Sequence, residues 1–147
     1  MHLRLNVNSL ILSRLTENNP ITIHMQQTLI IKNKKLMDLN TYIKAERTNR
    51  YKAAAIKKEW TTAVTWEAKV KKLKAMQLPV SVCITFYLKD KRRDKDNLLI
   101  NTKWLLDGLA QAGVIKNDGW DAISGIYFDW YISKEERMHI IIDEKYI

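Results

Sequence analysis

The chain has 147 residues, with 25 Lys and Arg against 16 Asp and Glu, which gives a formal charge of +9. This length suits one domain with a buried core and excludes two ordinary domains, while the excess of cations favours a polyanionic partner, either nucleic acid or an anionic membrane surface. A single cysteine, Cys83, excludes a disulfide framework and favours a reducing intracellular setting.

The N-terminal segment has no clean period and contains the turn signal Asn18-Asn19-Pro20, so we expect residues 1–27 to be an extension and residues 28–147 to form the domain. The extension has no long apolar region followed by a small-residue cleavage site, which argues against a signal peptide. Nothing reaches the roughly 18 unbroken apolar residues that a membrane span needs. We therefore expect a cytoplasmic protein without a membrane partner.

The first expected strand is TLIIKN at residues 28–33, and a polar, helical connection follows it. This connection carries Arg47 and Arg50 close to Tyr42 and Tyr51, a mixture of cations and aromatic rings that nucleic-acid surfaces favour. A solvated basic face would explain any one of these residues, but as a group they indicate DNA binding.

Residues 51–77 contain no Gly or Pro and are rich in Ala, Lys and Glu, which predicts a long helix. We expect Trp60 and Trp66 to be core or interface anchors on this helix. Residues 79–88, PVSVCITFYL, alternate between apolar and other residues and predict a half-buried strand, and Cys83 within it is expected in the core. The predicted inward face of this strand comprises Val80, Val82, Ile84, Phe86 and Leu88.

A second helix is predicted over residues 97–112, with Gly113 at its C-terminal cap. Two further strands are predicted at residues 123–132 and 138–142. The resulting order is β-α-β-α-β-β, an α+β fold in which two main helices pack on a small mixed sheet.

Two carboxylates, Asp94 and Asp96, lie between the strand 79–88 and the second helix. If they continue the strand, both side chains point to one face, and a hard divalent cation needs such converging oxygen ligands. The alternative is that Asp96 or Asn97 caps the helix. Both interpretations can hold together, because a single helix cap needs only one of Asp96 and Asn97 and leaves Asp94 unexplained.

The second helix places Lys103 and Asp107 on the same side as Asp96, seven and eleven residues after it. Lys103 could point its ammonium group toward a phosphate at the metal, or it could form only a surface ion pair with Asp107, worth a few tenths of a kcal/mol. Asp118 lies in an Asn-Asp-Gly sequence and by itself is a turn residue. The helix would carry the chain about 24 Å from Asp94 and Asp96, so Asp118 joins them only if the chain returns.

These motifs together resemble the RusA-type Holliday junction resolvases, particularly phage-borne members. The resemblance rests on RRDKDNL from Arg92, Lys103, LDGL from Leu106 and AGVIKND from Ala112. The upstream LNTYI from Leu39, AER from Ala45 and NRY from Asn49 also resemble the N-terminal segment of the family, so the resemblance covers residues 28–147. It implies a homodimer, intertwined or packed, that acts as a magnesium-dependent endodeoxyribonuclease. Such an enzyme nicks two strands of a four-way DNA junction symmetrically in DNA recombination and repair.

The resemblance also implies residue roles. The acidic cluster of the family matches Asp94, Asp96 and Asp118, which would hold Mg²⁺, with Mn²⁺ as an alternative and no organic cofactor. The helix lysine of the family matches Lys103. The chain departs from some members in carrying Asn117 where they have a second aspartate. A phage or prophage origin in a bacterial host is implied as well.

The basic run before the carboxylates is expected to hold the DNA backbone without reading bases. It consists of Lys91, Arg92 and Arg93.

Two other functions remain open. A non-catalytic basic nucleic-acid-binding module would use its acidic residues only as caps and turns. A DxD-type glycosyltransferase, with Mn²⁺ and a sugar nucleotide, suits the bare motif but not the size, the charge or the absence of a doubly wound pattern.

Overall fold

The sheet is assembled from strands that lie far apart in the sequence. The computed structural model describes residues 10–13 and 22–144. Its strands are β1 (Leu10–Ser13), β2 (Thr22–Lys32), β3 (Val80–Leu88), β4 (Ile123–Ile132) and β5 (Arg137–Glu144), in the spatial order β1-β2-β5-β3-β4. Strand β3 runs parallel to β4, whereas β5 runs antiparallel to both β2 and β3. The predicted α+β class with a small mixed sheet is therefore confirmed.

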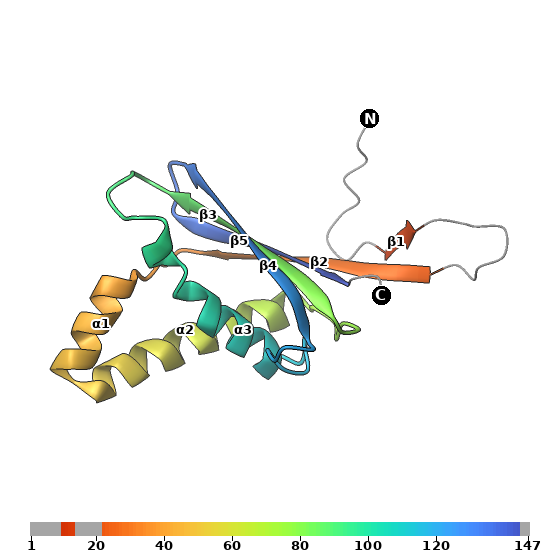
Figure 1. Ribbon diagram of the computed structural model, residues 1–147, viewed down its shortest axis with the longest axis horizontal. Helices are drawn as coiled ribbons and strands as arrows, with labels where there is room; N and C mark the ends of the chain where they lie inside the picture. Colours follow the sequence, from red (N-terminus) through yellow and green to blue (C-terminus); the bar gives the residue numbers. More distant parts are fainter. Residues whose placement is uncertain (1–9, 14–21, 145–147) are drawn as a thin grey trace.

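The helices α1 (Leu39–Thr48), α2 (Arg50–Val70) and α3 (Asn101–Gln111) all lie on one face of the sheet (Figure 1). Asp38 begins α1 by accepting a hydrogen bond of 2.8 Å from the Thr41 backbone N–H. Asn49 separates α1 from α2, because its side chain accepts a bond of 2.9 Å from the Tyr51 N–H and its extended backbone interrupts the helix. The polar connection after β2 is thus helical, as expected.

Strand β2 begins at Thr22, so the expected boundary between residues 27 and 28 falls inside a strand. Gln27 is fully buried, and its side chain exchanges two hydrogen bonds of 2.7 Å with the Lys74 backbone. Part of the expected extension therefore belongs to the sheet, while residues 1–9 and 14–21 lie outside the described residues. Helix α2 ends at Val70 rather than near residue 77, and Lys72 then takes a left-handed φ of 57°.

The core lies between the helices and the inward face of β3. All five residues predicted for that face are buried, with exposed fractions between 0% and 4%. Cys83 is exposed, so its expected core position is wrong; strand alternation turns it away from the helices. Trp60 is buried, as a core anchor should be, whereas Trp66 is 65% exposed and is not a core residue.

Helices α2 and α3 approach closely at Gly108. A Cβ atom built on Gly108 would lie 2.5 Å from Cβ of Val64, so no larger residue fits without a shift of the helices. Trp104 of α3 stacks on Trp60 of α2 with 6.0 Å between ring centroids. This packing fixes the helix that carries Lys103 and Asp107.

Helix α3 ends in a Schellman motif. The N–H of Val114 donates to the Leu109 carbonyl, and the N–H of Gly113 donates to the Ala110 carbonyl, each at 3.0 Å. Gly113 has a φ of 77°, which a glycine adopts without strain, so its predicted place at the helix end is confirmed. The chain then turns toward β4, and α3 becomes the crossover between two parallel strands.

Within the ranges 10–13 and 22–144, no helix has both the length and the apolar character needed to cross a bilayer.

Candidate active site

Asp94 and Asp96 lie in the segment that joins β3 to α3. Strand β3 ends at Leu88, Asp94 occupies irregular backbone, and Asp96 begins the short 3-10 helix η1 (Asp96–Leu98). The two aspartates therefore do not continue the strand, and alternation along β3 does not set the direction of their side chains.

The capping interpretation is also wrong. Helix η1 starts after Lys95 and α3 after Ile100, and neither start has a side-chain capping hydrogen bond. Both carboxylates are exposed, and among the described residues neither forms a side-chain hydrogen bond or an ion pair. Within residues 10–13 and 22–144, the carboxylates of Asp94 and Asp96 thus have no side-chain partner.

A buried side chain holds η1 in place. Asn101 is 0% exposed, and its Nδ2 donates to the carbonyls of Met37 and Leu98 at 2.8 Å each. Its Oδ1 accepts a bond of 3.1 Å from Trp104 Nε1. Asn101 therefore ties the residues before α1, the end of η1 and the first turn of α3 together. Sequence reasoning missed this role, because an isolated Asn in a helical pattern gives no sign of its partners.

The ammonium group of Lys103 contacts two carboxylates. Its Nζ lies 3.2 Å from Asp107 Oδ1 and 3.1 Å from Asp118 Oδ2. The i,i+4 pair with Asp107 was foreseen, whereas the contact with Asp118 shows that the chain after α3 folds back along the helix. Asp118 is thus not limited to a turn role.

The two carboxylates keep Lys103 charged. The hydrogen bond to Asp118, followed by the one to Asp107, raises the pKa of Lys103 above its ordinary value. Asp107 also lies 3.6 Å from Lys57 Nζ on α2. The side chain of Lys103 is 57% exposed, so the ammonium group is held in position and still reachable by a ligand.

The structure brings Asp118 to Lys103 but leaves Asp94 and Asp96 toward the start of α3. Asp96 begins η1, whereas Lys103 lies in the first turn of α3, which starts at Asn101. In the part of the chain that the structure describes, no group of three or more His, Cys, Asp or Glu side chains could hold a metal ion. A shared site for Asp94, Asp96 and Asp118 stays a prediction.

Asp94 and Asp96 nevertheless suit Mg²⁺. This ion is commonly held by one or two carboxylates, several waters and the phosphate oxygens of its substrate, rather than by a complete protein cage. The two aspartates supply oxygen ligands that no protein cation neutralises among the described residues. The donor set therefore fits a cation that substrate phosphate completes.

The predicted DNA-binding residues take different positions. Lys91 and Arg92 are exposed, and the Arg92 guanidinium lies 3.8 Å from Asp90. Arg93 is largely structural, because its Nη1 donates to the Leu36 carbonyl at 2.8 Å and its guanidinium pairs with Glu136. The other two predicted residues, Arg47 and Arg50, are exposed at the junction of α1 and α2.

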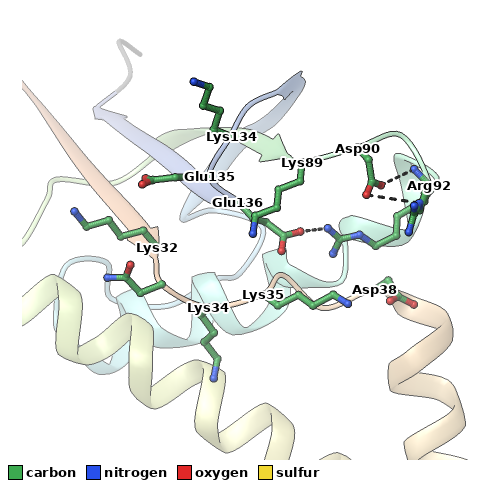
Figure 2. A pocket seen from close by; sticks show the side chains of 12 residues that line it. Lys32, Lys34, Lys35, Asp38, Lys89, Asp90, Arg92, Lys134, Glu135 and Glu136 are labelled. Atoms are coloured by element: carbon green, nitrogen blue, oxygen red, sulfur yellow. Dashed lines mark hydrogen bonds and ion pairs between the residues drawn. The ribbon is translucent and has the colours of Figure 1, made fainter.

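A hollow of about 680 Å³, which we term the lysine cleft, lies between the end of β2, the segment after β3 and the β4–β5 turn (Figure 2). It contains cations that sequence reasoning missed, because they come from three separate segments. They are Lys32, Lys35, Lys89 and Lys134. A second hollow of about 380 Å³ is lined by Asp94, Lys95 and Trp130 among others.

No model of a known protein family matches the chain, and a search of curated proteins gives no match.

Proposed function

We propose that the protein is a Mg²⁺-dependent, structure-selective endodeoxyribonuclease of the RusA type, which resolves four-way DNA junctions by paired symmetric nicks. The observation that carries this proposal is the pair Asp94 and Asp96. Other carboxylates nearby have partners: Asp90 accepts a bond of 2.9 Å from the Arg92 N–H, and Glu136 pairs with Arg93. Two exposed, unpartnered carboxylates in a strongly basic segment indicate a ligand from outside the chain.

Asp94 and Asp96 would hold the metal, which supplies activation of a water and neutralisation of charge on the reacting phosphate. Lys91 and Arg92 bind the DNA backbone through charge and give affinity without reading bases. Lys103, fixed by Asp107 and Asp118, presents a preorganised positive charge to the phosphate as negative charge develops on the leaving 3′ oxygen.

A homodimer suits this activity. A four-way junction contains pairs of equivalent strands, and a two-fold symmetric protein presents one site to each strand of a pair. Paired nicks then follow from symmetry, because both strands meet the same residues in the same geometry. The bacterial, phage or prophage setting belongs to the same proposal and rests on the sequence resemblance.

Replacing Lys103 with Met is expected to lower the cleavage rate of a bound junction by about 10²-fold, the order of effect of removing one preorganised electrostatic group. Lys103→Arg keeps the charge and should retain much of the rate. Because hydrogen bonds to Asp118 and Asp107 raise the pKa of Lys103, its ammonium group stays charged at neutral and mildly alkaline pH. The ratio of the Lys103→Arg and wild-type rates should therefore be constant across neutral and mildly alkaline pH. Single-turnover rates measure both effects, and equal rates for Lys103→Met and wild type would remove Lys103 from the site.

Metal removal provides the test of the proposed activity. Wild-type protein should nick a synthetic four-way junction with Mg²⁺, stop when EDTA is added, and recover when Mg²⁺ is restored in excess. Linear duplex of the same sequence should be cut far more slowly. Nicking that persists in EDTA, or equal nicking of both substrates, would contradict the proposal.

A non-catalytic DNA-binding module is the second candidate. It is favoured by the absence, among the described residues, of any group of three potential metal ligands. This module would bind junctions identically with and without Mg²⁺ and cut neither substrate.

A further inference from the structure

We propose that the lysine cleft binds the sugar-phosphate backbone of a duplex DNA arm next to the cleaved strand. This inference rests on the proposed nuclease function and assigns a ligand to residues outside the predicted DNA-binding set. The cleft opens beside the segment that carries Asp94 and Asp96, so a bound arm would be oriented with respect to both carboxylates.

The lining of the lysine cleft has an excess of positive charge. Seven cations and four carboxylates line it. Three of the carboxylates already have partners within the protein: Asp38 caps α1, Asp90 contacts Arg92, and Glu136 pairs with Arg93. Only Glu135 remains, so the carboxylates of the cleft do not neutralise its remaining cations.

Four lysines of the cleft have ammonium groups without a partner in the part of the chain that the structure describes. Lys34 pairs with Glu59 of α2, and the two arginines bind the carboxylates named above. Among the described residues, the remaining lysines form no ion pair and no hydrogen bond, and all are exposed: Lys32, Lys35, Lys89 and Lys134. Like charges in one hollow repel each other, and an anion that lies between them relieves this repulsion.

The arrangement of these lysines favours an extended anion. They come from three segments, namely the end of β2 with the residues that directly follow it, the segment after β3 and the β4–β5 turn, and they are spread around Glu136 (Figure 2). A single phosphate would need cations that converge on one point, whereas a DNA backbone presents successive phosphates to cations at separate points.

The cleft is continuous with the candidate active site. Asp90 and Arg93 line both the lysine cleft and the smaller hollow that contains Asp94. Arg93 is held by Glu136 of the β4–β5 turn and by the Leu36 carbonyl, so the wall between the two hollows is fixed from both sides. A backbone in the cleft thus lies against the same segment that presents the carboxylates.

The test replaces the four cleft lysines with Gln and measures binding of a four-way junction at several salt concentrations without Mg²⁺. Each lost phosphate contact lowers the slope of log affinity against log salt by about 0.9, so four lost contacts should lower it by about 3 to 4. A matched control removes the same charge from lysines at the C-terminal end of α2 and directly after it. These control residues are Lys69, Lys71, Lys72 and Lys74.

The control should change the slope by less than about 1. A second cleft variant, with the four lysines replaced by Arg, should keep the wild-type slope, and circular dichroism compares the folding of all variants. Equal slopes for the cleft Gln variant and wild type would overturn the inference, as would equal losses in the cleft and control variants. Cleavage is measured separately with Mg²⁺. Wild type that binds junctions without cutting them would refute the nuclease and leave the cleft supported by its slope, whereas wild type that binds no DNA would refute both.

Discussion

Replacing Asp96 with Asn is expected to lower junction cleavage by on the order of 10²-fold or more while DNA binding is retained, and Asp94→Asn should behave alike. The amide keeps the size of the side chain but loses the charge that holds a divalent cation. Neither aspartate caps a helix or forms an ion pair among the described residues, so neither substitution should disturb the fold. Affinity for the DNA should stay equal or rise, because a negative charge leaves a basic segment.

The measurement is single-turnover cleavage of a labelled four-way junction, combined with binding by fluorescence anisotropy. Glu67→Gln on α2 is the matched control, since it removes one negative charge from an exposed helix position away from the segment. Its cleavage rate should equal that of wild type. Undiminished nicking by Asp96→Asn would remove this carboxylate from the reaction, and loss of binding in parallel with cleavage would show that its role is not catalytic.

Replacing Trp104 with Ala is expected to lower the free energy of unfolding by about 3 to 5 kcal/mol, as for other large buried aromatic residues. Trp104 is 1% exposed and stacks on Trp60, and its Nε1 donates to the buried Asn101. Its loss would leave a cavity between α2 and α3 and would also free an acceptor of Asn101. This decrease is a large part of the stability of an ordinary domain.

Trp66→Ala provides the matched control. The same residue type is removed from a side chain that is 65% exposed, so the free energy of unfolding should change by about 0.5 kcal/mol or less. Chemical denaturation of the three proteins measures the difference. Similar losses from both substitutions would contradict the packing of α3 on α2 described above.

Local patterns predicted most of the fold because they act within a few residues. The alternation of β3 identified all five inward side chains, and Gly113 marked the end of α3. The predictions were wrong where contacts from elsewhere decide. Gln27 is buried because its side chain bonds the Lys74 backbone, and pairing with β1 and β5 brings β2 into the sheet earlier than its own sequence suggests.

The candidate site was less predictable, since it depends on how distant segments meet. The spacing of Lys103 and Asp107 gave their ion pair, but only the fold shows that Asp118 returns to the same lysine. The expectation for Asp94 and Asp96 assumed a continuous strand, whereas β3 ends at Leu88. The lysine cleft had no sequence signal, because three segments contribute its cations.

The most direct test of the proposed function is a strand-by-strand map of nicks. A synthetic four-way junction is labelled in turn on each of its four strands and incubated with the wild-type protein and Mg²⁺. The proposed function predicts one nick in each strand of an opposed pair, at positions related by the two-fold symmetry of the junction. Intact strands throughout, or nicks without this symmetry that also occur in linear duplex, would contradict it.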